Sequence, residues 1–260
     1  MPLTKPLTFG WYELMAKDVP AALAFYSKVV GHWTTKDSGM PGAGYTLIEL
    51  QGKAIGGALA LTDDMCAAGA RPGWLGYLAV EDLDAKEKEF LAAGGRTVRP
   101  IFEIPGVIRF TIVVDPHGAV LVLFQGLTPG HTLPTFPAGT PGAVGWHELH
   151  AGNGGEAWEF YSRLFGWTKD MAVDMGPIGT YQTWKSTGDP IGGMMTKMPE
   201  APAPFWLYYF NVDALGAALE RVKAGGGQVI HGPQPVPGGS FIANCLDPEG
   251  GIFALVSRMA

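Results

Sequence analysis

Hydrophobic and polar residues alternate along several short segments of the chain, a two-residue period typical of strands with one buried face. In the first quarter of the chain this alternation predicts strands at 7–16, 44–50 and 55–61. Between the first two, apolar residues recur at helical spacing from position 19 to 30, and Asp18 stands where a helix cap belongs. We therefore expect a strand, a helix and further strands, in that order.

The same order is predicted three more times. After a stretch rich in glycine and proline at 69–73, the pattern predicts a strand at 74–80, a helix over 82–93 and three strands, the last two at 107–114 and 119–124. The second half follows with strands at 145–151, 180–185, 191–197 and 205–212, helices at 154–165 and 214–224, and three final strands. The fold class predicted is α+β, built from βαβββ modules at about 8–61, 74–124, 143–197 and 205–257.

Residues 127–142 separate the two halves. This segment holds four prolines and three glycines, a composition typical of a semi-rigid linker. The sequence therefore predicts one domain at 1–126 and a second at 143–260, each large enough to bury its own core.

The two halves repeat the same landmarks about 135 residues apart, which indicates a duplicated domain. The repeated landmarks are Gly10-Trp11-Tyr12-Glu13-Leu14 and Gly145-Trp146-His147-Glu148-Leu149, Phe25-Tyr26 and Phe160-Tyr161, Ile55-Gly56-Gly57 and Ile191-Gly192-Gly193, and Asp115-Pro116-His117-Gly118 and Asp247-Pro248-Glu249-Gly250. A residue found in both copies is expected to belong to the fold. A polar residue found in one copy is a candidate for chemistry.

Charge and composition exclude several classes of protein. The net charge of −6 and the lack of any run of Lys or Arg argue against nucleic acid as a partner. No apolar run approaches the length of a membrane span, and the first residues lack the pattern of a secretory signal, so we expect a cytoplasmic protein with no membrane partner. Cys66 and Cys245 do not fall at equivalent positions, which favours two free thiols over a disulfide or a metal site.

The four modules, the Phe-Tyr pair in the first helix of each half and the Asp-Pro-x-Gly turn before each last strand resemble the vicinal oxygen chelate superfamily. This superfamily includes glyoxalase I, the extradiol dioxygenases and the bleomycin resistance proteins. The resemblance covers roughly residues 8–257. It implies two tandem, pseudo-symmetric glyoxalase-like domains, each enclosing a cavity between two paired modules, and in metal-dependent members a divalent ion held by His, Gln or Glu.

The superfamily's metal ligands do not carry over to this chain. The ligand position of the first strand falls on Trp11 and Trp146, that of the second module on Leu75 and Leu207, and that of the last strand on Val122 and Ala254. Glu49 remains alone near the fourth position, and its copy lies near Trp184. One carboxylate does not hold a divalent ion, so we expect neither a metal nor another cofactor.

Acidic and aromatic side chains remain as candidates for chemistry. Period-two alternation places Trp11 and Glu13 on one face of the first strand, and Trp146, Glu148 and His150 on the same face of its copy, with His147 pointing away. Burial would make Glu13 or Glu148 a candidate general base, although both could instead accept structural hydrogen bonds. His150 has Met15 as its copy, so it could form an acid–base dyad with Glu148, or lie satisfied at a strand end.

Repeated tyrosines and one arginine are expected to line a ligand cavity. Tyr45 and Tyr181 recur near the third strands, and Tyr77 and Tyr209 recur on the fifth strands, where they suit either an aromatic ligand or core packing. Arg109 is a candidate anchor for an anionic ligand, although the sequence favours an ordinary exposed strand arginine.

Three functions stay open at this point. The first is metal-independent binding of small hydrophobic or aromatic molecules, for sequestration or specialised metabolism, by a monomer or weak homodimer. The second is an enzyme of lyase, isomerase or hydrolase type that uses Glu148 and His150 for proton transfer. The third is a glyoxalase-like detoxifying enzyme with an unconventional metal site.

Overall fold

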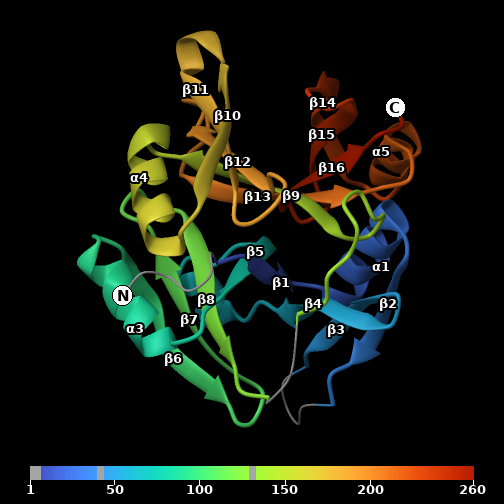
Figure 1. Cartoon of the computed structure of the whole chain (residues 1–260). Helices are drawn as coiled ribbons and strands as arrows, with labels where there is room; N and C mark the ends of the chain where they lie inside the picture. Colours follow the sequence, from blue (N-terminus) through green and yellow to red (C-terminus); the bar gives the residue numbers. More distant parts are fainter. Residues whose placement is uncertain (1–6, 40–43, 129–132) are drawn as a thin grey trace. The chain divides into compact units, whose positions relative to one another are not determined.

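The computed structural model describes residues 7–39, 44–128 and 133–260, and its α+β class and four βαβββ modules confirm the predicted fold (Figure 1). The first two modules consist of β1 (Phe9–Ala16), α1 (Val19–Val30), β2 (Trp33–Asp37), β3 (Thr46–Leu50) and β4 (Lys53–Ala60), followed by β5 (Gly73–Ala79), α3 (Leu83–Ala92), β6 (Arg96–Ile104), β7 (Ile108–Val114) and β8 (Val120–Gly126). A short helix, α2 (Asp63–Ala67), connects them.

The last two modules repeat this order. They consist of β9 (Val144–Ala151), α4 (Gly154–Phe165), β10 (Thr168–Asp174), the 3₁₀ turn η1 (Gly176–Ile178), β11 (Thr180–Lys185) and β12 (Gly192–Thr196), followed by β13 (Phe205–Asn211), α5 (Leu215–Ala224), β14 (Gln228–Val236), β15 (Ser240–Leu246) and β16 (Ile252–Ser257). The predicted linker at 127–142 includes four residues, 129–132, that lie outside the described part of the chain.

The strands form two sheets with the same order. The first sheet runs β2-β3-β4-β1-β5-β8-β7-β6, and the second runs β10-β11-β12-β9-β13-β16-β15-β14. In each module the first strand pairs in parallel with the last, as β1 does with β4, and the other neighbours are antiparallel. The equal order of the two sheets is the structural form of the sequence repeat.

Helices α1, α3 and α4 begin at residues that cap them, whereas α5 follows Ala214 without a side-chain cap. The carboxylate of Asp18 accepts the Ala21 N–H at the start of α1, and Asp82 accepts the Ala85 N–H at the start of α3. Asn153 accepts two backbone N–H groups at the start of α4, which ends at Gly166 in the left-handed conformation. These caps explain why the helix boundaries were readable in the sequence.

The strand directly after the first helix of each half, β2 or β10, was not located from the sequence. All residues of β2 except Trp33, and all residues of β10, are exposed or partly exposed, and both strands lie at the edge of a sheet. An edge strand with little buried surface lacks the alternation on which the strand predictions rest.

The structure divides into two compact units that do not coincide with the two sequence repeats. One unit contains the described residues of Met1–Gly10, Gly76–Leu133 and Trp146–Trp206, and the other those of Trp11–Leu75, Pro134–Gly145 and Leu207–Ala260. Each unit therefore combines one module from each half, and the expected boundaries at 126 and 143 do not coincide with those of the units.

Aromatic side chains on the helices form the core of each unit. In the first unit, Phe90 on α3 packs against Phe160 and Phe165 on α4, with ring centroids 5.0 and 6.5 Å apart. In the second unit, Phe25 on α1 packs against Phe253 on β16 at 5.9 Å. Aromatic contacts between the two halves thus join modules that are distant in sequence.

Cys66 and the buried Cys245 are free thiols. Among the described helices, none has the length and apolar character needed to cross a membrane.

Candidate functional site

The second repeat contains a hydrogen-bonded cluster of Trp146, Tyr181 and Glu148, which we call the second Trp–Tyr–Glu cluster. The indole N–H of Trp146 donates to Tyr181 Oη over 2.8 Å, and Tyr181 Oη donates to Glu148 Oε2 over 2.8 Å. Trp146 and Glu148 lie two residues apart on β9, so they share a face, and Tyr181 reaches them from β11.

Gly193 leaves room for the ring of Tyr181. It lies opposite Glu148 in the pairing of β12 with β9, and a Cβ at this position would stand 2.3 Å from the Tyr181 ring and hydroxyl. The ring therefore crosses β12 where a side chain is absent, which explains the second glycine of the Ile-Gly-Gly motif.

The first repeat contains the same arrangement, the first Trp–Tyr–Glu cluster of Trp11, Tyr45 and Glu13. Trp11 donates to Tyr45 Oη over 3.0 Å, and Tyr45 is hydrogen-bonded to Glu13. Gly57 lies opposite Glu13, and its added Cβ would stand 2.3 Å from Tyr45 Cζ. Six of the residues expected at the site are thus brought together in two equivalent clusters.

Both tyrosines stay protonated and act as donors. Burial raises the pKa of Tyr45 and of Tyr181 well above the usual value, and the adjacent carboxylate raises it further. Glu13 and Glu148 are buried and accept these bonds, which gives each glutamate the partner that a structural role requires.

His150 distinguishes the second cluster from the first. Its Nε2 lies 2.7 Å from Glu148 Oε1, its ring stacks on Phe205 at 4.4 Å, and only 12% of its side chain is exposed. In the first repeat the equivalent residue is Met15, which is buried and carries no titratable group. A histidine held by a carboxylate can accept or donate a proton, so this pair has the geometry of an acid–base dyad.

His147 lies on the other face of β9. Its Nδ1 lies 2.7 Å from the Ile191 carbonyl oxygen, and its ring stacks on Phe9 with centroids 4.4 Å apart. Burial lowers its pKa to about 4, so the ring is neutral near pH 7 and contributes packing rather than charge.

Arg109 does not join an aromatic face. Its guanidinium makes two hydrogen bonds, of 2.7 and 3.1 Å, to Asp84 on α3, and Glu103 lies 3.7 Å away. Its neighbour Thr111 also points to α3, where its hydroxyl donates to Glu87. Arg109 therefore faces the helix, and its charge is already paired.

The opposite face of the same strands carries aromatic side chains that the sequence reasoning missed. Phe102, Phe110 and Phe124 lie directly across from one another on β6, β7 and β8. Tyr77 on β5 packs against Phe110 and Phe124 at 6.1 and 6.0 Å. We call these four residues the aromatic row.

The repeat itself held the signal for the aromatic row. At a spacing of 132, the equivalents of its phenylalanines are Gln234, Ile242 and Val256, so three aromatic residues occur in one copy only. Tyr77, in contrast, is repeated as Tyr209, which is also buried. Comparing aromatic as well as polar residues between the copies would have found the row.

The residues at the superfamily's ligand positions do not fit a metal ion. Trp11 and Trp146 point their indole N–H groups at tyrosine hydroxyls, and the other positions carry Leu, Val or Ala apart from Glu49. In residues 7–39, 44–128 and 133–260, no three His, Cys, Asp or Glu side chains group closely enough to hold a metal.

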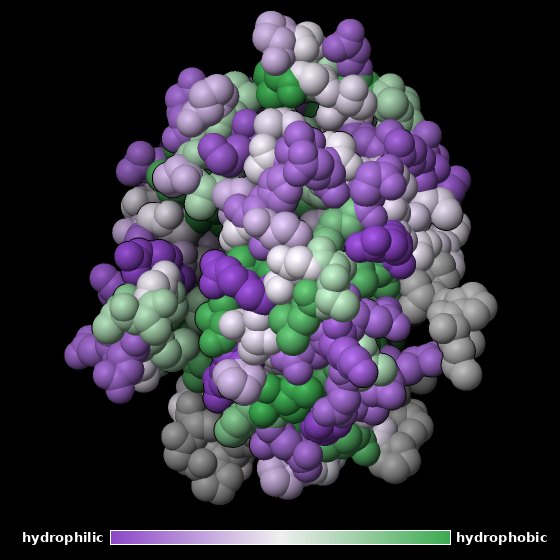
Figure 2. Space-filling view, turned by 90° about the vertical axis from the view of Figure 1, so that its left-hand side faces the viewer, coloured by the Kyte–Doolittle hydropathy of each residue, from purple (hydrophilic) through white to green (hydrophobic). Residues whose placement is uncertain are grey.

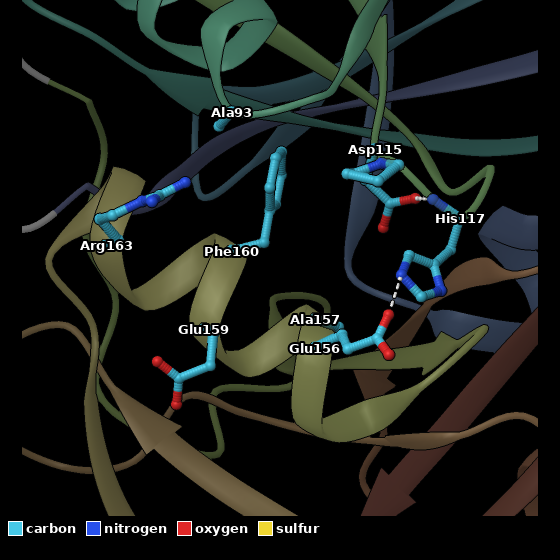
Figure 3. A pocket seen from close by; sticks show the side chains of 9 residues that line it. Ala93, Asp115, His117, Glu156, Ala157, Glu159, Phe160 and Arg163 are labelled. Atoms are coloured by element: carbon cyan, nitrogen blue, oxygen red, sulfur yellow. Dashed lines mark hydrogen bonds and ion pairs between the residues drawn. The ribbon is translucent and has the colours of Figure 1, made fainter.

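A pocket of about 400 Å³ opens between α4, the end of α3 and the turn at 115–118 (Figure 3). Its side chains include His117, whose Nε2 lies 3.0 Å from Glu156 Oε2, with Phe160 and Arg163 further along α4. Glu156 is largely exposed, and no residue lining the pocket belongs to the clusters or the aromatic row.

The side of the molecule that carries α3 and α4 is covered mainly by hydrophilic residues, with hydrophobic residues in small patches among them (Figure 2). Such a mixture is ordinary for a solvated surface and marks no partner.

Comparison with known proteins identifies the family. The model of the glyoxalase/bleomycin resistance protein/dioxygenase superfamily matches residues 8–123 and 144–255, one match in each half. The chain belongs to this superfamily.

Two curated relatives span nearly the whole chain. "Putative glyoxylase CFP32" of Mycobacterium tuberculosis is 32% identical over 253 residues, covering 96% of this chain and 94% of the relative. "Anthracycline biosynthesis protein DnrV" of Streptomyces peucetius is 31% identical over 261 residues, covering 95% and 92%.

Solved structures share the fold at low identity. The Mn(II)-bound glyoxalase from Novosphingobium aromaticivorans has a TM-score of 0.67 at 16% identity, with 99% of this chain and 84% of that chain covered. The 2,3-dioxygenase LapB from Pseudomonas sp. KL28 has a TM-score of 0.66 at 13% identity, with 98% and 93% covered.

Proposed function

We propose that this protein binds a small aromatic molecule on the aromatic row, without a metal ion, and acts as a monomer or weak homodimer. The observation that carries the proposal is the alignment of Phe102, Phe110 and Phe124 across three adjacent strands in one repeat only. The fold does not require these rings, because its second copy is built with Gln234, Ile242 and Val256.

One ring of the row is accessible to a ligand. Phe102 is 46% exposed, whereas Phe110 and Phe124 are buried. Phe102 thus presents an accessible ring beside the buried rings of Phe110, Phe124 and Tyr77. Flat aromatic molecules stack on such surfaces.

The relatives support an aromatic ligand by their names. DnrV and DauV, both named anthracycline biosynthesis proteins, are 31% identical to this chain over 95% of its length. Anthracyclines are planar polycyclic compounds, so a role in sequestration or specialised metabolism of such molecules fits the aromatic row.

Equilibrium binding of 2-naphthol, followed by its fluorescence, tests this proposal. We expect saturable binding that Phe110→Leu weakens about tenfold through loss of ring contact, and that chelator treatment leaves unchanged. The matched control is Ile242→Leu, at the equivalent position of the second repeat, which should bind as the unaltered protein does. Binding that Phe110→Leu leaves unchanged, or that the chelator abolishes, would contradict the proposal.

The distance of 2.7 Å between His150 and Glu148 favours a second candidate function, an enzyme that transfers a proton. Glu148 would orient the imidazole of His150, which would take a proton from a substrate or return one to it. The reaction class is then a lyase, isomerase or hydrolase reaction in which a proton leaves carbon or water. A glyoxalase-like reaction fits the name of the mycobacterial relative but not the metal-ligand positions of this chain.

Exchange of the methylene protons of phenylpyruvate in D₂O, followed by NMR, tests for proton transfer. Under the enzyme hypothesis the protein accelerates exchange, and both Glu148→Gln and His150→Met lose the acceleration. His150→Met restores the residue of the first repeat, so the side-chain volume stays suitable for the fold. Equal exchange rates with and without protein would contradict the enzyme hypothesis and leave ligand binding as the only proposed function.

A further inference from the structure

The guanidinium of Arg99 lies beside the aromatic row, because strand β6 shifts its pairing register at two places. Thr97 on β6 points to α3, where its hydroxyl donates to Glu87. Strict alternation would place Arg99 on that same side. The pairing of β6 with β7 shifts between Thr97 and Arg99 and again between Arg99 and Phe102, so Arg99 pairs with Ile112 and Phe102 with Phe110.

These shifts turn Arg99 to the face of the aromatic row. Ile112 and Phe110 alternate with Thr111, which faces α3, so both lie on the opposite side of the sheet. Bulges commonly aim a side chain at a functional site in this way.

The guanidinium of Arg99 lies over two rings of the row. Its Cζ lies 4.6 Å from the centroid of Phe102 and 5.3 Å from that of Phe110. Aromatic rings attract a guanidinium through cation–π interaction, and the planar N–H donors of a guanidinium match both oxygens of a carboxylate. The rings therefore hold the guanidinium of Arg99 beside the row.

No carboxylate of the described chain forms an ion pair with Arg99. Arg109, on the next strand, shows the contrast, because Asp84 and Glu103 both pair with it. Arg99 is exposed, and the chain as a whole carries a net charge of −6. Attraction of an anion to this surface would have to come from Arg99 itself rather than from the overall charge.

The second repeat has the same irregular strand, but it carries neither the arginine nor the phenylalanine. Strand β14 shifts its pairing at the same places, around His231 and Gln234, the equivalents of Arg99 and Phe102. There His231 Nε2 lies 2.5 Å from Gln234 Oε1, so the two side chains satisfy each other. The fold thus does not require a free cation at this position.

We infer that Arg99 binds the anionic group of the ligand, so the molecule held on the aromatic row is an aromatic carboxylate. This inference rests on the proposed function, because it needs a ligand on the row. The ring of the ligand packs on the aromatic row, and its carboxylate accepts hydrogen bonds from the guanidinium of Arg99.

Binding of 2-naphthoate and of neutral 2-naphthamide, two probes of the same shape, tests the inference by calorimetry. We expect the unaltered protein to bind the carboxylate at least tenfold more tightly than the amide. Arg99→Gln should remove this preference and leave the affinity for the amide unchanged. Arg109→Gln, the matched control on the other face of the sheet, should keep the preference.

The outcomes separate the inference from the proposed function. Equal affinity for the two probes in the unaltered protein, or a preference that survives Arg99→Gln, overturns the role of Arg99 while leaving aromatic binding intact. If neither probe binds the unaltered protein, both the proposed function and the inference fail. Circular dichroism checks that Arg99→Gln keeps the fold, which is expected because this side chain is exposed.

Discussion

The hydroxyl of Tyr161 donates a hydrogen bond to Oδ2 of Asp115 over 3.0 Å, and so joins the Phe-Tyr pair of the second half to the Asp-Pro-x-Gly turn of the first. The reverse pair, Tyr26 and Asp247, makes the same bond over 2.8 Å. Each compact unit contains one of these bonds. Two motifs that looked independent in the sequence are therefore partners in space.

The same aspartate also shapes its own turn. Oδ1 of Asp115 accepts the backbone N–H groups of His117, Gly118 and Ala119 at 2.7 to 2.9 Å, while Oδ2 takes the tyrosine hydroxyl. The carboxylate is almost completely buried, so its oxygens depend on these donors.

Removing the hydroxyl of Tyr161 should therefore destabilise the protein. We expect Tyr161→Phe to lower the free energy of unfolding by about 1–2 kcal/mol, because a buried carboxylate oxygen loses its donor. Asp115→Ala should cost more, since three backbone N–H groups of the turn lose their acceptor. Urea denaturation measures both, and a loss below about 0.5 kcal/mol for Tyr161→Phe would show that water replaces the hydroxyl.

Gly193→Ala should disrupt the second Trp–Tyr–Glu cluster. The new methyl group would stand 2.3 Å from the Tyr181 ring, so the ring must leave its bond to Glu148 and the protein should lose a few kcal/mol, on the order of an overpacked core site. The control is Gly155→Ala in the first turn of α4, where the added Cβ would only approach Asn153 Oδ1 at 3.4 Å.

A double-mutant cycle attributes that loss to the tyrosine. In a Tyr181→Ala background the ring is gone, so Gly193→Ala should cost clearly less than in the unaltered protein. Equal costs in the two backgrounds would mean that the methyl group clashes with something other than Tyr181.

Acid should destabilise the fold through His147. Its pKa is about 4 in the folded protein, below the usual 6.5, so the unfolded chain binds the proton more readily. This contribution is absent above about pH 6.5, and the folded state loses stability as the pH falls towards 4, by about 3 kcal/mol in total.

His147→Phe isolates this effect. The variant loses the hydrogen bond to the Ile191 carbonyl, so it should be less stable near pH 7, but its free energy of unfolding should fall less between pH 6.5 and 4. Denaturation of both proteins across this range gives the difference. Parallel curves would mean that His147 is protonated in the fold without a penalty.

Metal content can be predicted from the donor set. Because Trp11 and Trp146 replace ligands, we expect native mass spectrometry to find no stoichiometric divalent ion, even after incubation with Mn²⁺ and buffer exchange. A stoichiometric ion would contradict this. Its loss in Glu49→Gln or in His150→Met would then indicate which repeat holds it.

Much of the fold could be predicted because repetition and capping are local signals. The helices α1 and α4 match their predicted bounds, since Asp18 and Asn153 mark their starts and glycines mark their ends. Strands β2 and β10 escaped because edge strands show little hydrophobic alternation. Alternation on β9 also placed Trp146, Glu148 and His150 on one face. In the structure, Tyr181 links Trp146 to Glu148 by two hydrogen bonds, and His150 is hydrogen-bonded directly to Glu148.

The side-chain directions on β6 and β7 could not be predicted in the same way. Arg109 was a candidate anchor for an anionic ligand, and the structure shows it hydrogen-bonded to Asp84 on the helix side of the sheet. Arg99 reaches the aromatic row only because β6 shifts its register twice, and a bulge leaves no reliable mark in a single sequence.

The sequence by itself determined the superfamily, the four modules, the missing metal ligands and the residues of both Trp–Tyr–Glu clusters. These follow from composition, period and repetition, which are properties of neighbouring residues along the chain. Only the tertiary structure decided three contacts. Tyr161 donates a hydrogen bond to Asp115, the ring of Tyr181 packs over Gly193, and Arg99 rather than Arg109 lies beside the aromatic row. Those relationships depend on strand register and on helix packing between modules distant in sequence, and such long-range contacts are fixed only when the whole core is assembled.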